Sequence, residues 1–194
     1  MEKIILASQS PRRKQLLQWA EIPFEVIVSD SDETYPRGLS PFEVAEHIAF
    51  NKAKAVQQKI AEEKAGNDRY TIIGADTIVV LGHRIIGKPV NKDEAISTLQ
   101  HLSGKAHSVI TGVCLLSGKR KKVFFEETLV EFLKLSKEQI EHYVTAYKPY
   151  DKAGAYAIQE WIGVIGIKSI RGDFYNVMGL PVSRLIKELH ALDE

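Results

Sequence analysis

Segments typical of β-strands and of α-helices alternate along the whole chain, and this alternation restricts the fold to the α/β class. Strands are predicted at residues 4–7, 24–28, 70–81, 84–86, 108–116, 123–133 and 161–167. Helices are predicted from Pro11, from Ser40 to about residue 64, over residues 92–102, from Ser136 to about residue 147, and from Pro181. The connections 117–121 and 151–159 and a glycine-containing segment before Pro181 are predicted as loops. Because no linker separates two sets of elements, we expect one domain over residues 1–194, built around a mixed sheet.

Composition places the chain among globular proteins and excludes several classes of function. With 194 residues, 44% of them hydrophobic, it can bury a substantial core. Its 26 Lys and Arg residues nearly balance 25 Asp and Glu residues, so it has no basic field for a nucleic-acid backbone. It has one cysteine and no apolar run long enough to span a membrane, and we expect no signal peptide. We therefore expect a cytoplasmic protein that binds neither nucleic acid nor a membrane.

The first predicted helix carries two arginines in its first turn, where cations are normally disfavoured. Ser10 is expected to cap this helix and Pro11 to occupy its first position, which places Arg12 and Arg13 beside free backbone N–H groups. A cation at such an end costs roughly 0.3–1 kcal/mol, whereas a bound phosphate would be attracted by both the helix and the arginines. The segment therefore suggests a site for a phosphorylated ligand. The alternative is that both arginines point into solvent.

Asp76 interrupts an otherwise apolar face of a predicted strand. It shares that face with Ile72, Gly74 and Ile78, where an unpaired carboxylate would be costly. A metal ion, a lysine or a catalytic water would compensate it, while the alternative is a structural salt bridge or a strand end exposed to solvent. The small residues Gly74 and Ala75 would allow a ligand to approach the strand closely.

Lys52 interrupts the apolar face of the second predicted helix in a similar way. Steps of four residues align it with Val44, Ile48 and Val56. We expect its ammonium group to face a cleft. The alternative is a side chain that snorkels past the core, as we expect of Lys59.

Residues 82–88 have the spacing of a phosphate-binding P-loop as far as Lys88, but the next residue is Pro89. Proline supplies neither the hydroxyl that would hold magnesium nor a backbone N–H, and the segment is predicted as a hairpin. Lys88 remains a candidate phosphate contact, although a lone surface lysine is more often only solvated.

Candidate metal ligands are carboxylates rather than histidines or cysteines. Glu33, at the end of the acidic loop 30–33, would be a second carboxylate beside Asp76 for a hard cation such as magnesium, although most acidic loops are only solvated surface. The six histidines show no zinc spacing, and one cysteine cannot form a thiolate cluster. Cys114 is expected in the core, and neither Ser8 nor Ser10 has an identified base, so covalent catalysis is not expected.

Six segments, taken in order, resemble the Maf family over essentially the whole chain. They are Ala7-Ser8-Gln9-Ser10-Pro11-Arg12-Arg13, Gly74-Ala75-Asp76-Thr77, Gly87-Lys88-Pro89, Leu102-Ser103-Gly104, Asp151-Lys152-Ala153-Gly154-Ala155-Tyr156-Ala157-Ile158-Gln159 and Val177-Met178-Gly179-Leu180-Pro181. The ordered set is far more specific than any one motif. The resemblance implies an elongated, two-lobed fold related to that of inosine triphosphate pyrophosphatases, with a central cleft in a mixed sheet.

The resemblance also implies a function and a set of site residues. The activity would be a nucleoside triphosphate pyrophosphatase that releases a nucleoside monophosphate and pyrophosphate, requires a divalent cation such as Mg²⁺ or Mn²⁺, and is commonly a homodimer. Asp76 matches the proton acceptor, and it would either act on the attacking water or hold the cation that does so. Arg12, Thr77 and Gln159 match positions associated with substrate choice. The remaining polar positions match Ser8, Arg13, Glu33, Lys52 and Lys88.

The form of these motifs bears on the base and on the biological role. The Ser-Gln-Ser-Pro-Arg-Arg and Ile-Gln forms resemble the branch that acts on dTTP and UTP, with modified pyrimidine nucleotides as further candidates. Two departures flank the expected base pocket, since Ala157 replaces a glycine and Glu160-Trp161 follows Gln159 where glycine is usual. The expected role is removal of damaged or surplus nucleotides. The alternative is a nucleotide-binding regulatory protein that acts on septum formation through a partner.

Overall fold

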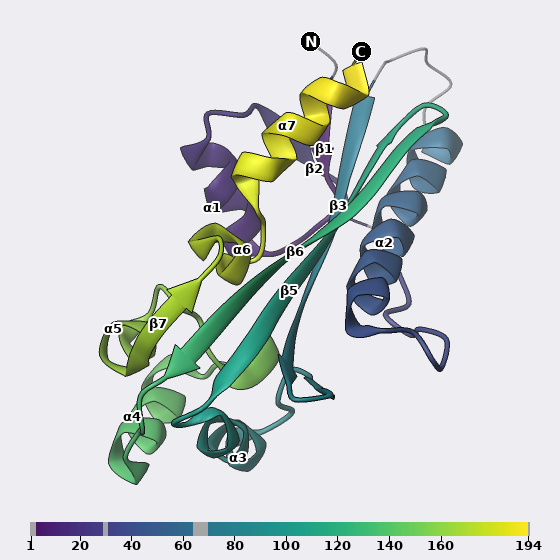
Figure 1. The fold of residues 1–194 in the computed structure, drawn as a ribbon. Helices are drawn as coiled ribbons and strands as arrows, with labels where there is room; N and C mark the ends of the chain where they lie inside the picture. Colours follow the sequence, from purple (N-terminus) through teal and green to yellow (C-terminus); the bar gives the residue numbers. More distant parts are fainter. Residues whose placement is uncertain (1–2, 29–30, 64–69, 194) are drawn as a thin grey trace. The chain divides into compact units, whose positions relative to one another are not determined.

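The computed structural model describes residues 3–28, 31–63 and 70–193 (Figure 1). The strands are β1 (Lys3–Leu6), β2 (Phe24–Val26), β3 (Tyr70–Leu81), β4 (Arg84–Ile86), β5 (Ala106–Ser117), β6 (Arg120–Phe132) and β7 (Ile167–Arg171). The helices are α1 (Pro11–Trp19), α2 (Pro41–Glu63), α3 (Lys92–Leu102), α4 (Lys137–Tyr147), the 3₁₀ helix η1 (Ala153–Ala155), α5 (Trp161–Gly166), α6 (Phe174–Met178) and α7 (Val182–Asp193). Asp30 and the predicted helix end at residue 64 lie outside the described residues.

The strands of the described residues form one seven-stranded sheet in the order β2-β1-β3-β5-β6-β7, with β4 paired to β3. Strand β1 runs parallel to β2 and to β3, whereas β4 is antiparallel to β3 and β7 is antiparallel to β6. The predicted α/β class with a mixed sheet is therefore confirmed.

The chain divides into two compact units. Unit 1 comprises Met1–Asp76, Thr111–Glu126 and Gly179–Glu194, and unit 2 comprises Thr77–Ile110 and Glu127–Met178. Strands β3, β5 and β6 each contribute residues to both units, so the division falls within strands rather than at a linker.

In unit 1, helix α2 packs directly on β3 and β5 at two glycines. A Cβ atom at Gly74 would lie 2.2 Å from the backbone oxygen of Ala49, and one at Gly112 would lie 2.3 Å from that of Ala45. Small residues on both sides thus allow the helix and strand backbones to approach closely. This face of α2 joins a buried cluster that includes Ile5, Ala53, Val56, Ile60, Ile72 and Cys114.

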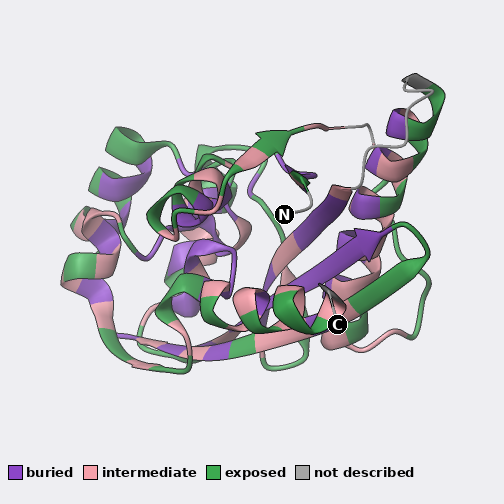
Figure 2. Cartoon of the chain, turned by 90° about the horizontal axis from the view of Figure 1, so that it is seen from above, coloured by how far each residue is buried: buried purple, intermediate pink, exposed green. Residues whose placement is uncertain are grey.

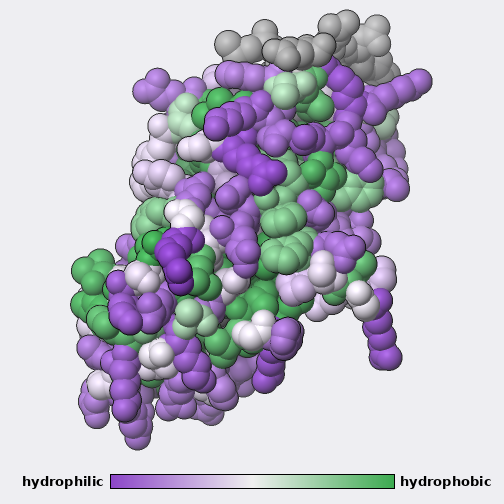
Figure 3. Space-filling model, in the orientation of Figure 1, coloured by the Kyte–Doolittle hydropathy of each residue, from purple (hydrophilic) through white to green (hydrophobic). Residues whose placement is uncertain are grey.

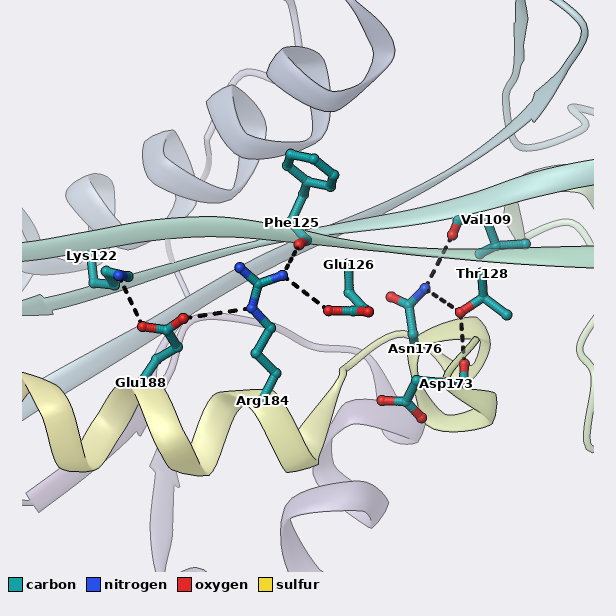
Figure 4. Close-up of polar contacts among 9 residues, drawn as sticks. All are labelled: Val109, Lys122, Phe125, Glu126, Thr128, Asp173, Asn176, Arg184 and Glu188. Atoms are coloured by element: carbon teal, nitrogen blue, oxygen red, sulfur yellow. Dashed lines mark hydrogen bonds and ion pairs between the residues drawn. The ribbon is translucent and has the colours of Figure 1, made fainter. Parts of the chain in front are cut away.

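Helix α7 is anchored to β6 in unit 1 by Arg184 (Figure 4). Its Nη1 donates to the carbonyl oxygen of Phe125 at 2.6 Å and to the Glu126 carboxylate at 3.0 Å. Glu188, one turn further along α7, pairs with Arg184 at 3.5 Å and with Lys122 at 3.0 Å. Figure 1 shows α7 on the opposite side of the strands from α2.

In unit 2, a buried amide joins α6 to the sheet (Figure 4). Asn176 Nδ2 donates to the carbonyl oxygen of Val109 on β5 at 3.1 Å and to Thr128 Oγ1 on β6 at 3.0 Å. Thr128 Oγ1 in turn donates to the carbonyl oxygen of Asp173 at 2.9 Å. Helix α6 lies in the segment predicted as a glycine-containing loop, so that prediction was wrong there. Its position depends on this tertiary anchor, which no local pattern reveals.

Residues 161–167 were predicted as a strand, and this prediction was wrong. Trp161–Gly166 form helix α5, and the strand β7 begins only at Ile167. A short apolar run does not distinguish a strand from a buried helix by periodicity. Position 163 of this helix requires a glycine, because a Cβ atom there would lie 1.8 Å from the Ile158 carbonyl oxygen.

The connection between β5 and β6 is shorter than predicted. Only Gly118 and Lys119 form the turn, with Gly118 at φ 58°, so the charged residues after it belong to β6. Lys121 lies over the ring of Phe50, 5.0 Å from its centroid. This cation–π contact is a tertiary interaction between an exposed lysine of β6 and helix α2.

Burial follows the elements in the expected way. Figure 2 shows buried residues along the strands, whereas the helices alternate between buried and exposed positions. On the face drawn in Figure 3, hydrophobic and hydrophilic residues are intermingled. Within the described ranges, none of the helices combines the length and the apolar character needed to cross a membrane.

Candidate active site

The segment that joins β1 to α1 closes around Arg13. Ser8 Oγ accepts the Ser10 N–H at 3.3 Å and Nη1 of Arg13 at 3.0 Å, and Arg13 Nε donates to the carbonyl oxygen of Gly179 at 2.8 Å. Ser8 and Arg13 are each only 8% exposed. The alternative in which both arginines point into solvent is therefore wrong for Arg13.

Ser10 and Pro11 take the predicted places at the start of α1, but the capping is different. Ser10 occupies the N-cap position, yet its side chain makes no capping hydrogen bond within the described chain. The predicted side-chain cap was therefore wrong. Ser8, two residues earlier, is the hydroxyl that orders this turn, because it binds both the Ser10 backbone and Arg13.

Arg13 is a buried cation that two carboxylates stabilise. Burial lowers the pKa of Arg13 and the neighbouring charge of Arg12 acts in the same direction, whereas the charges of Asp76 and Glu33 raise it. Arg12, the next residue back, is only half-buried. The first turn of α1 therefore adds positive potential to the part of unit 1 in which Asp76 lies.

Lys52 joins two carboxylates. Its Nζ lies 2.7 Å from Asp76 Oδ1 and 2.7 Å from Glu33 Oε1. The side chains of Lys52 and Asp76 are 16% and 13% exposed, whereas that of Glu33 is 51% exposed. Asp76 is thus paired with a lysine, one of its expected partners, and Lys52 meets these charges instead of snorkelling past the core.

The fold explains why these side chains meet. Residues 71–80 of β3 are buried except for Asp76 and Thr77, which are half-buried. Asp76 lies on the same strand face as Gly74, where α2 approaches most closely, and Lys52 is on α2. The contact that excludes a side chain at Gly74 thus sets the distance between the lysine and the carboxylate.

A side-chain turn presents Glu33. The Asp32 carboxylate accepts the Thr34 N–H at 2.8 Å and the Thr34 hydroxyl at 2.6 Å, which closes the chain around Glu33. These two hydrogen bonds lower the pKa of Asp32. The Asp-x-Thr pattern at residues 32–34 is the sequence signal for such a turn.

Asp76 and Glu33 fit a cation site that water and substrate phosphates complete better than a site built from protein ligands alone. Among the described residues, no group of three or more His, Cys, Asp or Glu side chains is arranged to hold a metal ion. Magnesium, however, usually takes only one or two carboxylates and completes its shell with water and substrate phosphates. Asp76 and Glu33, both within 2.7 Å of one ammonium group, suit that incomplete, oxygen-only site.

The other predicted site residues belong to unit 2. Thr77 follows Asp76 on β3, Lys88 is exposed after β4, and Gln159 is exposed in the loop before α5. The loops that carry Lys88 and Gln159 are joined by a hydrogen bond of 3.1 Å from the Gly154 N–H to the Gly87 carbonyl oxygen.

Glu160, one of the departures from the family pattern, has its carboxylate bound by other side chains of unit 2. Tyr143 donates its hydroxyl to Glu160 Oε2, and Lys152 Nζ lies 3.6 Å from Glu160 Oε1. Trp161 packs edge-on against His142, with ring centroids 4.9 Å apart. No local sequence pattern links Tyr143 to this loop, because the Ala157 N–H that it binds lies fourteen residues later.

The comparisons with known proteins identify the family of the chain. The dTTP/UTP pyrophosphatase of Bacillus cereus (strain G9842) is 48% identical over 193 residues, covering 100% of this chain and 97% of that protein. The dTTP/UTP pyrophosphatase of Parabacteroides distasonis is 48% identical over 188 residues, covering 96% and 94%. Among solved structures, the Staphylococcus aureus Ham1 protein has a TM-score of 0.44 and 18% identity, over 68% of this chain and 72% of that one. A model of the family described as Maf-like protein matches residues 3–192, and the chain therefore belongs to the Maf family.

Proposed function

We propose that this chain is a nucleoside triphosphate pyrophosphatase that acts on dTTP and UTP. Water would add across the bond between the α- and β-phosphates, giving the nucleoside monophosphate, pyrophosphate and a released proton. Relatives with 46–48% identity over the full length carry the name dTTP/UTP pyrophosphatase. The structural observation that carries the proposal is the Lys52 ammonium group held between Asp76 and Glu33 beside the buried Arg13.

The charged side chains around Lys52 have distinct roles in the proposed reaction. Asp76 orients the attacking water and accepts its proton, since it is a carboxylate fixed on a strand. Lys52 holds that carboxylate in place, and its positive charge, with those of Arg12 and Arg13, attracts the phosphates. Lys88 adds a further positive charge at the phosphates. Ser8 contributes by fixing the guanidinium of Arg13.

A divalent cation, Mg²⁺ or Mn²⁺, belongs to the proposal. Asp76 and Glu33 are the residues that would hold it, and it would neutralise charge on the phosphates. We assign the choice of base to Arg12, Thr77 and Gln159, with the Gln159 amide hydrogen-bonding the edge of a pyrimidine. The proposed setting is the cytoplasmic nucleotide pool, where a homodimer would remove damaged or surplus nucleotides.

The test is pyrophosphate release from a panel of natural and modified nucleoside triphosphates, with Mg²⁺ or Mn²⁺. Asp76→Asn is nearly isosteric, so it should keep the fold and lower the turnover about 10²- to 10⁴-fold. Asp93→Asn, at an exposed position of α3, is the matched control and should keep full activity. Nucleotide binding without release by the unaltered protein would instead favour the regulatory alternative.

A further inference from the structure

Gln159 is an exposed side chain on a loop, and an exposed amide can discriminate between bases only if its backbone is held still. The residues before it, Gly154 and Ala155, both have positive φ angles, of 70° and 58°. A left-handed conformation at Ala155 is unfavourable for a residue with a side chain and persists only where the surroundings enforce it.

The Tyr143 hydroxyl binds this loop on both sides of Gln159. Tyr143 lies on α4 and is fully buried at 0% exposure. Its oxygen accepts the N–H of Ala157 at 3.2 Å, two residues before Gln159. The same hydroxyl donates its proton to Glu160 Oε2, one residue after Gln159. One hydroxyl group therefore uses both its donor and its acceptor capacity to fix the four residues 157–160.

Glu160 is in turn held by a buried cation. Lys152 has a side chain only 9% exposed, and its Nζ lies 3.6 Å from Glu160 Oε1 and 2.7 Å from Asp151 Oδ1. The Glu160 carboxylate is thus engaged by a hydroxyl and an ammonium group of unit 2. It shares the Lys152 ammonium group with Asp151, which lies closer to it.

We propose that Tyr143 and Glu160 are positioning residues that fix the backbone of Gln159 and thereby determine how sharply the protein discriminates between bases. The inference rests on the proposed function, because it assigns a consequence to the placement of a residue that contacts the base. It adds two residues that do not touch the substrate themselves. Their effect is expected on substrate binding and selectivity rather than on the chemical step.

The experiment compares Tyr143→Phe with Tyr147→Phe. The first variant keeps the buried ring and removes only the hydroxyl, while the second removes the hydroxyl of the neighbouring, 40% exposed tyrosine whose ring stacks on Tyr143 at 4.9 Å. For Tyr143→Phe we expect the KM for UTP to rise roughly 3- to 10-fold and the preference for UTP over CTP in kcat/KM to fall by a similar factor, with kcat little changed. Tyr147→Phe should match the unaltered protein.

Two more measurements separate positioning from a loss of folding. Glu160→Gln keeps an acceptor for the Tyr143 hydroxyl and should retain most of the selectivity, whereas Glu160→Ala should behave like Tyr143→Phe. Hydrogen exchange at the Ala157 amide reports the contact independently of turnover and should be faster in Tyr143→Phe.

Each result has a definite meaning. Unchanged exchange at Ala157, or faster exchange with unaltered KM and selectivity, would overturn the positioning role while leaving the proposed function standing. Absence of pyrophosphate release from the unaltered protein would overturn both.

Discussion

Gly74 is the position at which the smallest change should disturb both the stability and the active site. The substitution Gly74→Ala adds one Cβ atom, which would lie 2.2 Å from the backbone oxygen of Ala49 and 2.8 Å from the Cβ of Ala53. The nearest obstacle is a helix backbone, which cannot rotate away as a flexible side chain could. Helix α2 must therefore move away from β3.

The size of this movement gives the expected effects. A carbon atom normally lies no closer than about 3.3 Å to a carbonyl oxygen, so α2 or β3 must shift by about 1 Å. Overpacking of this kind costs about 1–3 kcal/mol of unfolding free energy, less than the stability of a typical domain. The same shift separates Lys52 from Asp76, and a misplacement of about 1 Å lowers activity by about 100-fold.

Urea unfolding and initial rates of pyrophosphate release measure the two effects. At Gly87 a Cβ atom would meet nothing within 4 Å, so Gly87→Ala is the control for stability and should not destabilise the protein. Gly112→Ala brings β5 against α2 near Ala45, and should reduce stability with a smaller loss of activity, since β5 does not carry Asp76. A Gly74→Ala variant with unaltered stability and turnover would refute the claim that this contact sets the site.

Three further outcomes follow from buried polar groups. Arg13→Lys removes the guanidinium group, which donates hydrogen bonds to both Ser8 and Gly179, and should lower the unfolding free energy by about 1–3 kcal/mol. An unchanged urea midpoint would show that these hydrogen bonds do not stabilise the fold. Burial lowers the pKa of His107 to about 4, whereas the same imidazole in the unfolded chain has a pKa of about 6.5. Between these two pH values the unfolded chain binds a proton at His107 and the folded protein does not. The free energy of unfolding should therefore fall by about 3 kcal/mol as the pH falls from 6.5 to 4, and His107→Gln should remove that part of the pH dependence. If plots of unfolding free energy against pH were parallel for the two proteins, His107 would not be the cause. Burial raises the pKa of Cys114 to about 12, so iodoacetamide at pH 8 should modify it only after denaturation, and rapid labelling of the native protein would show that the thiol is accessible.

The elements that the sequence predicts well are those with a local stop or start signal. The helix predicted from Ser136 begins with a capping box, in which Ser136 Oγ accepts the Gln139 N–H at 3.2 Å and Gln139 Oε1 accepts the Ser136 N–H at 2.8 Å. Ser40 and Glu43 form the same reciprocal pair at the start of α2. Residues 161–167 carry no such signal, and the close contact of the Gly163 backbone with Ile158 in helix α5 exists only in the folded chain.

The residues of the candidate site stand out in the sequence one by one, but their arrangement does not. Lys52 and Asp76 each stand out because a charge interrupts an apolar face, and that argument requires only the period of the element. Their pairing depends on the register of α2 on β3, which the close contact at Gly74 fixes. The carbonyl of Gly179 that binds Arg13 lies 166 residues away in sequence, and no residue type marks a backbone oxygen as a ligand.

The two carboxylates around Lys52 are held very differently, and this difference suits the proposed site, which a cation and a triphosphate would complete together. Asp76 is 13% exposed on a central strand, whereas Glu33 is 51% exposed on a loop. An exposed ion pair contributes about 0–1 kcal/mol, so Glu33 can exchange its partner at little cost. Separating Lys52 from Asp76 would leave a largely buried charge unpaired, which costs far more. The arrangement thus combines one fixed carboxylate, suited to hold a water molecule in a constant position, with one adjustable carboxylate, suited to follow a cation that arrives with its substrate.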